Sequence, residues 1–394
     1  MRTLELFSGA GGLALGLKQA GFDHVQLVEF NKQACNTLRK NFDPNTVFEG
    51  DIKDFDFASI SNIDFVAGGP PCQPFSLAGK HKADLDNRDM FPFAVEAIKA
   101  LRPKGFLFEN VKGLLRKSFS SYFEYILLRL KYPTQTTNTD QWEEDLERLR
   151  KIDVNPGIPA EYDVKFKLLN TADFGVPQKR ERVIIVGIRS DLNCSWAFPD
   201  PTHSKNLLQI CQQNGEYWEG HGLTNVDSYF DGQKRHIQTS QLKLFPHSVK
   251  PWRTVRDCLK KQPHPNDNHN IAGHEFRDGA RIYPGHTGSY IDEPAKTLKA
   301  GVHGVPGGEN MIRYVDGKVR YFTVFEGKLL QTFPHDYEIT GAWGEGMRQI
   351  GNAVPVRLAK ILGTSIYSTI SENKDIEGGR LKPTLQSPKA NTHL

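Results

Sequence analysis

The chain has 394 residues, of which 38% are hydrophobic and 24% are charged, and its formal net charge is +4. This composition indicates a globular protein that is too long for one comfortable core, so we expect two domains. No apolar run approaches the roughly 20 residues that cross a bilayer, which argues against a membrane-spanning protein. The N-terminus also lacks the apolar core and cleavage site of a signal peptide.

The first 111 residues alternate short apolar strands with helices. Strands are expected at residues 3–7, 25–30, 46–51, 63–69 and 106–111. Helices are expected after the first two strands and at residues 91–102. This alternation is typical of an α/β fold, with a parallel sheet covered by helices on both faces.

The next segments complete this sheet. Residues 118–160 are expected to hold a helix plus an insertion that includes 131–160. Residues 163–170 and 182–189 read as two further strands, which would close the sheet as a hairpin-like pair.

The composition changes after residue 190. Residues 191–320 carry nine of the thirteen histidines and thirteen of the 35 glycines, with few long apolar runs. They predict a loop-rich second domain with short β-strands. The first domain, residues 1–190, would be completed by residues 321–373, where 347–370 reads as a turn and an apolar helix. Residues 374–394 are polar and are expected to be disordered.

The cysteines and histidines limit the chemistry. Five widely spaced cysteines without a C-x-x-C pair argue against a disulfide framework or a zinc site. They indicate a reducing compartment, so we expect a cytoplasmic protein. No histidine spacing supports a metal site, and no metal is expected. The small positive charge is compatible with a polyanionic partner but does not require one.

A glycine loop connects the first strand to the first helix. Residues 9–14, Gly-Ala-Gly-Gly-Leu-Ala, satisfy a G-x-G-x-x-G/A pattern, in which a ligand can approach the backbone and the helix N-terminus. Glu29 ends the second strand, where a carboxylate can accept ribose hydroxyls, and Asp51 ends the third, where it can accept an adenine amino group. These features indicate an adenosine-containing cofactor and leave NAD and S-adenosylmethionine both open.

A cysteine lies in a stiff turn after the fourth predicted strand. In GGPPCQPFS, residues 68–76, prolines and glycines surround Cys72 and restrict its backbone. Ligands of open α/β sheets bind beyond the carboxyl ends of strands, and Glu109 has the equivalent position on the next strand. A nucleophile paired with a carboxyl group is therefore one interpretation. An inert turn thiol and a solvated acid are the alternative.

Three polar residues alternate where the last strand of the sheet begins. Gln178, Arg180 and Arg182 are two residues apart, so on a strand they would share one face. They could grip a phosphate, order an acidic loop or solvate an edge strand, and by themselves they favour the last reading.

Eight ordered blocks resemble those of a DNA (cytosine-5)-methyltransferase of the bacterial restriction–modification type. They are ELFSGAGG, VEF, GDI, GGPPCQPFS, ENV, PQKRER, FTVFEGKLLQTFP and GNAVP. The resemblance spans residues 3 to about 365, outside a variable region. It implies a Rossmann-like S-adenosylmethionine-dependent methyltransferase sheet with a smaller, loop- and β-rich target-recognition domain in 191–320. It further implies a monomeric enzyme that methylates double-stranded DNA and protects it from a cognate restriction endonuclease.

The resemblance assigns roles to individual residues. Cys72 would add to carbon 6 of a flipped-out cytosine, and Glu109 would donate to its N3. Gln178, Arg180 and Arg182 would hold the base edge, the sugar-phosphate or Glu109. The implied contacts of S-adenosylmethionine, and of its product S-adenosylhomocysteine, are Phe7, Gly9, Ala10, Gly12, Glu29 at the ribose, Phe30 stacked on adenine, Asp51 and Ile52 at the adenine edge, Pro71, Phe91, Asn352 and Val354.

Some positions depart from the family pattern. Glu5 stands where the family commonly has aspartate, which keeps the charge. Phe325 and Leu329 stand where arginines are usual, although Glu326 fits, so the ion-pair support of the hinge between the domains is in question. Arg256, Arg277 and Gln238 in the variable region are candidate base-reading side chains, and a plain surface position is an equally good interpretation of each.

Three alternatives compete with this interpretation. An NAD-dependent dehydrogenase would explain the glycine loop and Glu29 but gives Cys72 and Glu109 no task. An RNA (cytosine-5)-methyltransferase shares the blocks but tends to have a smaller recognition region. A catalytically silent DNA-binding protein would not need the pair of Cys72 and Glu109.

Overall fold

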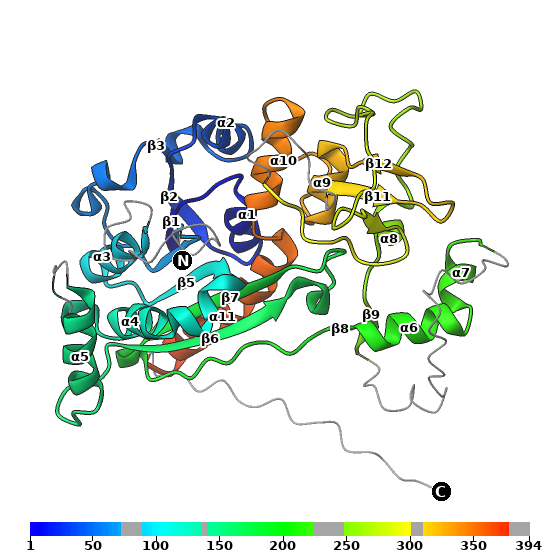
Figure 1. Cartoon of the computed structure of the whole chain (residues 1–394). Helices are drawn as coiled ribbons and strands as arrows, with labels where there is room; N and C mark the ends of the chain where they lie inside the picture. Colours follow the sequence, from blue (N-terminus) through cyan, green and yellow to red (C-terminus); the bar gives the residue numbers. More distant parts are fainter. Residues whose placement is uncertain (72–88, 136, 138–140, 224–247, 301–309, 378–394) are drawn as a thin grey trace, which may run out of the picture.

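The computed structural model describes residues 1–71, 89–135, 137, 141–223, 248–300 and 310–377. A seven-stranded sheet in the order β3-β2-β1-β4-β5-β7-β6 forms the centre of the first domain (Figure 1). Its strands are β1 Arg2–Leu6, β2 Asp23–Glu29, β3 Val47–Glu49, β4 Phe65–Gly68, β5 Gly105–Val111, β6 Tyr162–Asn170 and β7 Glu181–Arg189. The first five pair in parallel, and β7 is antiparallel to both β5 and β6. The predicted α/β sheet and its closing strand pair are confirmed.

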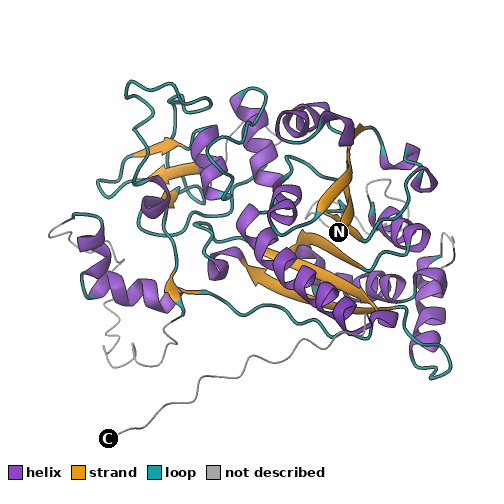
Figure 2. Ribbon diagram, turned by 180° about the vertical axis from the view of Figure 1, so that it is seen from behind, coloured by secondary structure: helices purple, strands orange, loops and turns teal. Residues whose placement is uncertain are grey.

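Helices cover both faces of this sheet, which explains why the central strand β4 is apolar and buried along its whole length. Phe65 and Ala67 of β4 pack with α1 (Gly12–Gln19) and α11 (Val356–Glu377), and Figure 2 shows α11 crossing this face. The alternate residue Val66 faces the opposite core, with α3 (Phe91–Leu101) and α4 (Ser120–Lys131). Because successive side chains of a strand point to opposite faces, β4 contributes residues to both cores.

The remaining helices of the first domain follow the sequence pattern in part. The other helices here are α2 Lys32–Asn41, α5 Trp142–Asp153 and α10 Trp343–Asn352, while α9 Val324–Leu330 shares an apolar core with Val255, Leu298 and Ile312 of the second region. The predicted helix plus insertion in 118–160 contains α4 and α5. The turn expected at the start of 347–370 is wrong, because α10 continues to Asn352 and buries Met347 and Ile350. α11 extends to Glu377, four residues into the predicted tail, whose residues 378–394 lie outside the described part.

The second region contains short strands and also helices that the sequence pattern did not reveal. The strands are β8 His203–Ser204 with β9 Lys250–Pro251, and a small sheet of β10 Ser289–Tyr290, β11 Met311–Arg313 and β12 Val319–Tyr321. The helices are α6 Lys205–Gln213, α7 Glu216–Gly220 and α8 Val255–Leu259. No helix in the described ranges is long and apolar enough to cross a membrane.

A buried ion pair joins the second region to α9. Arg320 on β12 donates from both terminal nitrogens to the two carboxylate oxygens of Glu326, at 2.6 Å each. Both side chains are almost fully buried, and Phe325 and Leu329 are buried as well. The arginine absent from α9 is therefore supplied by a neighbouring strand.

Two glycines of α1 allow unusually close packing against the C-terminal segment. A Cβ at Gly12 would lie 2.2 Å from the Val354 carbonyl oxygen, and one at Gly16 would lie 2.4 Å from the Ala359 Cβ. Contacts this short exclude any side chain, so α1 and α11 meet backbone to backbone.

We predict that Gly16→Ala destabilises the protein by about 1–3 kcal/mol, because the added methyl group must push α1 away from α11. Gly344→Ala on α10 is the matched control, since a Cβ there would meet no atom within 4 Å, and it should be neutral or stabilise by up to about 1 kcal/mol. Urea unfolding measures both free energies. Equal effects of the two substitutions would contradict the packing argument.

Candidate active site

A cavity of about 740 Å³ lies at the carboxyl ends of β1, β2, β4 and β5. This cavity, called the candidate site below, is also lined by residues 352–354 between α10 and α11. Open α/β sheets bind their ligands at this edge. The chain topology therefore brings segments from both ends of the sequence to one place.

The glycine loop forms one side of the candidate site. After β1 the backbone turns through positive φ values at Phe7 (56°) and Gly9 (53°). A Cβ at Gly9 would meet no atom within 4 Å, so the backbone is open to a ligand there. The amide of Gly9 donates to one carboxylate oxygen of Glu29, and the amide of Asn31 donates to the other, both at 2.7 Å.

The carboxylate of Glu29 thus connects the ends of β1 and β2. Burial raises its pKa, and the hydrogen bonds from Asn31 and Gly9 offset part of that rise. Each of its oxygens still has a further lone pair for a ligand hydroxyl. The next residue, Phe30, lines the candidate site and is 74% exposed. Because this large apolar ring is exposed to water beside the cavity, a planar ring of a ligand could stack on it and remove it from water.

The structure gathers eight of the twelve cofactor residues expected from the sequence in the lining of the candidate site. These eight are Phe7, Gly9, Ala10, Glu29, Phe30, Pro71, Asn352 and Val354. The other four lie outside this lining. Gly12 makes the helix contact described above, and Asp51 caps a short 3-10 helix by accepting from the Lys53 amide. Ile52 and Phe91 are 4% and 1% exposed and belong to the core.

An acid and an arginine form the other side of the candidate site. Glu109 is near the end of β5, and Arg182 is the second residue of the adjacent strand β7. The Arg182 Nε lies 2.6 Å from the Glu109 Oε1, and their side chains are only 14% and 10% exposed. The angle leaves this carboxylate oxygen without a well-directed hydrogen bond. The contact is therefore a close ion pair at the wall of the candidate site.

Gln178 and Arg180 do not share one strand face with Arg182, because β7 begins only at Glu181. Gln178 is fully buried, accepts from the Leu298 amide at 3.1 Å and does not line the candidate site. Arg180 lines the site but donates to the carbonyls of Gly351 (2.7 Å) and Leu298 (3.3 Å). Burial, followed by the charge of Arg182, lowers the pKa of Arg180 to about 9.

The expected nucleophile, Cys72, lies outside the described residues, while its neighbour Pro71 lines the candidate site. The Pro71 carbonyl accepts from the Met90 amide at 3.0 Å. The Pro70 carbonyl accepts from the Asn110 side chain at 2.9 Å. Asn110 was missed by sequence reasoning, although its place beside Glu109 could have indicated it.

A second missed residue is Arg348 on α10, which lines the candidate site. It makes two hydrogen bonds to Glu345, at 2.8 and 2.6 Å, and its charge offsets a small part of the rise that burial causes in the pKa of Glu29. No sequence signal pointed to Arg348, because its proximity to β2 depends on long-range packing.

The candidate base readers lie in different environments. Arg256 is held by both oxygens of Asp292, at 2.6 and 2.9 Å, and Arg277 stacks 4.4 Å from the centre of the Trp343 ring. Gln238 lies outside the described residues. Within the described ranges, no group of three or more His, Cys, Asp or Glu side chains could hold a metal ion.

Comparison with known proteins gives a consistent picture. The family model of C-5 cytosine-specific DNA methylases matches residues 1–132 and 144–368. The chain is 34% identical over 373 residues to Type II methyltransferase M.PspPI of Psychrobacter sp. (strain TA137), covering 93% of this chain and 79% of that protein. It is 32% identical over 375 residues to Type II methyltransferase M.Eco47II of Escherichia coli, covering 94% and 79%.

Solved structures share the fold. A putative DNA modification methyltransferase encoded within an Escherichia coli prophage aligns with a TM-score of 0.59 at 18% identity, covering 94% of this chain and 99% of that one. The Dnmt2 methyltransferase of S. pombe aligns with a TM-score of 0.56 at 18% identity, covering 93% and 98%. At 18% sequence identity, these two matches show that the fold is shared.

Proposed function

The chain belongs to the family of C-5 cytosine-specific DNA methylases, and we propose that its candidate site methylates carbon 5 of a flipped-out cytosine through a transient bond to Cys72. Family membership makes it an S-adenosylmethionine-dependent DNA (cytosine-5)-methyltransferase and sets aside the dehydrogenase alternative. The observation that supports the proposal is a single cavity that is lined both by candidate cofactor-binding residues and by candidate catalytic residues. The glycine loop, Glu29 and Phe30 form one side, and Glu109 with Arg182 forms the other.

The lining fits the methyl donor. Phe30 offers an exposed ring for adenine, and the carboxylate of Glu29 keeps lone pairs that can accept from ribose hydroxyls. The open backbone at Gly9 leaves room for the rest of the molecule. When bound, S-adenosylmethionine supplies an electrophilic methyl group. The assignments of Gly12, Asp51, Ile52 and Phe91 as direct contacts are not part of the proposal, because these residues lie outside the lining.

The thiol supplies what carbon 5 of cytosine lacks, namely nucleophilic character. The Cys72 thiolate adds to carbon 6, and the electron pair of the 5,6 double bond becomes available at carbon 5 for bond formation with the methyl group. The protonated form of Glu109 offsets the added charge by donating its proton to N3, and Arg182 lies beside that carboxyl group. Loss of the carbon-5 proton to a base then restores the double bond and expels the Cys72 thiolate.

The substrate must bring its base to this cavity. A stacked cytosine cannot reach an acid recessed beside the sheet edge, so the base rotates out of the duplex at a cost of a few kcal/mol. Residues 191–320 would read the neighbouring bases in the major groove. Since two relatives are Type II methyltransferases, we infer a role in restriction–modification, with a cognate endonuclease acting at the same sequence.

Phe30→Ala should weaken S-adenosylmethionine binding about tenfold or more, because stacking of a base on an aromatic ring contributes about 1–3 kcal/mol. Phe276→Ala is the control, since Phe276 is also exposed (41%) but is not in the lining of the candidate site. Isothermal titration calorimetry without DNA gives both dissociation constants. Unchanged affinity of the Phe30 variant would remove this ring from the proposed cofactor site.

Cys72→Ala should reduce methyl transfer by at least about 10³-fold, because no other group can activate carbon 5. The variant should keep its affinity for S-adenosylmethionine and should form no covalent adduct with a duplex that carries 5-fluorocytosine at the target. Cys194→Ala, at a half-buried thiol outside the lining, should form the adduct normally. Transfer at the wild-type rate by the Cys72 variant would overturn the mechanism.

Plasmid DNA from cells that express the chain should contain 5-methylcytosine at one recurring sequence. Bisulfite sequencing reads the modified positions and their neighbours, and the empty vector is the control. Competition between the plasmid and transfer RNA in a labelled-methyl assay then separates a DNA substrate from an RNA one. Preferential labelling of RNA would contradict the proposed substrate.

A further inference from the structure

A second cavity, outside the candidate site, has a positive lining. It has a volume of about 630 Å³ and lies among α6, α7, α8 and the first turn of α11. We call it the basic pocket. Its lining includes two carboxylates, Glu216 and Asp257, and four cationic side chains, Lys250, Arg253, Lys260 and Arg357.

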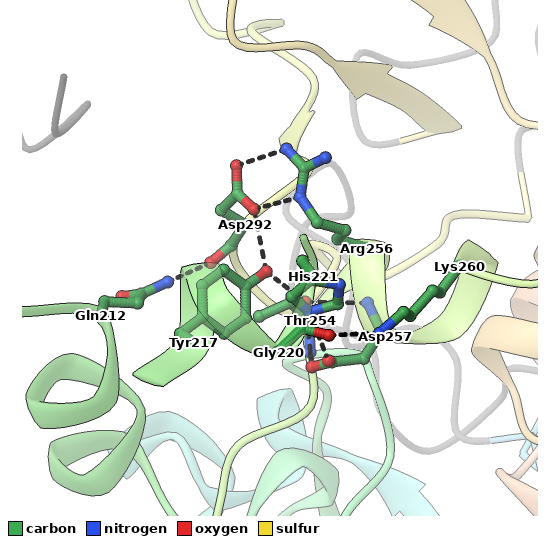
Figure 3. Close-up of polar contacts among 9 residues, drawn as sticks. All are labelled: Gln212, Tyr217, Gly220, His221, Thr254, Arg256, Asp257, Lys260 and Asp292. Carbon is green, nitrogen blue, oxygen red and sulfur yellow. Dashed lines mark hydrogen bonds and ion pairs between the residues drawn. The ribbon is translucent and has the colours of Figure 1, made fainter. Parts of the chain in front are cut away.

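Two carboxylates at or beside the basic pocket, Asp257 and Asp292, already have structural tasks (Figure 3). The third, Glu216, accepts from the Cys211 thiol at 3.4 Å. Asp257 accepts from the Thr254 amide at 2.7 Å, where it completes the capping box of α8, and it contacts His221 Nε2 at 2.9 Å. Asp292 binds Arg256 through both oxygens and accepts from the Tyr217 hydroxyl at 2.8 Å. These contacts fasten α7 to α8 and make the wall of the basic pocket stiff.

Three cationic side chains of the basic pocket lack a partner of opposite charge among the described residues. In the described part of the chain, Lys250, Arg253 and Arg357 have no carboxylate within ion-pair distance, and Arg357 donates to the Phe174 carbonyl instead. Burial and then the charges of Arg357, Arg253 and Lys250 lower the pKa of the adjacent His203 to about 4. Burial and the charge of Arg253 also lower the pKa of Arg357. An anion in the pocket would relieve this repulsion.

We propose that the basic pocket binds a backbone phosphate of the DNA duplex whose cytosine is methylated, with Arg253 and Lys250 as its principal contacts. This proposal rests on the proposed function, which makes DNA the substrate. Backbone phosphates are bound mainly by arginine and lysine, and such contacts fix the position of a protein on DNA without reading its sequence.

Chain connectivity favours DNA over a small free anion. Val354 lines the candidate site and Arg357 lines the basic pocket, so their Cα atoms are at most about 11 Å apart along the chain. One turn of B-DNA spans roughly 34 Å. A single duplex with its target base in the candidate site is therefore long enough to reach the basic pocket with a phosphate near that base.

The double variant Arg253→Gln/Lys250→Gln tests the proposal. Its affinity for a 30-base-pair duplex that contains the methylated sequence should fall about tenfold near physiological salt. The slope of log affinity against log salt should decrease by roughly 2, since each lost phosphate contact reduces it by about 0.9. Its affinity for S-adenosylmethionine should remain that of the wild type, which shows that the sheet domain is intact.

Lys99→Gln/Lys151→Gln is the matched control. It removes the same charge from exposed positions on α3 and α5, which lie at the opposite end of the molecule from α6 and α7 (Figures 1 and 2). This variant should keep the wild-type affinity and salt slope. A decrease in slope equal to that of the first variant would mean that net charge alone is responsible, which overturns the proposal.

Three further outcomes distinguish failure of the pocket assignment from failure of the proposed function. If the double variant binds DNA like the wild type, while inorganic phosphate at constant ionic strength raises the melting temperature of the wild type alone, the pocket binds a free anion and the DNA assignment is wrong. If wild-type protein methylates DNA and the double variant matches it in affinity and slope, only the pocket assignment fails. If wild-type protein neither binds nor methylates DNA, the proposed function fails, and this proposal fails with it.

Discussion

The close contact between α1 and the segment that leads into α11 is the constraint on which the rest of the structure depends. Gly12 and Gly16 have no side chain, so the carbonyl of Val354 and the first turn of α11 lie directly against α1. This contact returns the C-terminal segment to the first domain and puts Asn352 beside the glycine loop. The cavity at the sheet edge is complete only because two segments more than 300 residues apart pack this closely.

The same contact controls the link between the two regions of the protein. The Gly351 carbonyl, just before Val354, accepts from Arg180, whose other terminal nitrogen donates to Leu298 in the second region. Gln178 accepts from the Leu298 amide. Gln178 and Arg180, for which the family resemblance implied a role at the substrate, therefore also connect the two regions, and they precede Arg182, the residue paired with Glu109.

The sequence predicted the elements that depend on local pattern. The apolar runs gave each strand of the large sheet, and the strand-to-helix turn at Gly9 indicated its ligand-binding edge. Sequence reasoning failed where distant residues decide the role. No residue near Gly12 in the sequence indicates that it packs against Val354. The different environments of Gln178 and Arg182 could not be predicted either, because they depend on where β7 begins. Phe91 looked like a cofactor contact from its block, yet its burial in the core follows from the packing of α3.

The position of Arg320 in the chain, at the end of the region expected to read DNA, has a consequence for engineering this protein. Arg320 is the last residue of the region expected to read DNA, and its buried partner Glu326 lies on α9, just beyond the end of that region. A chimera that transplants residues 191–320 from a relative without an arginine at the end of that segment would strand the carboxylate in an apolar environment, at a cost of about 3–5 kcal/mol. Grafting a new specificity onto this scaffold therefore requires that Arg320 and Glu326, or their equivalents, come from the same protein, with the junction either before Arg320 or after Glu326.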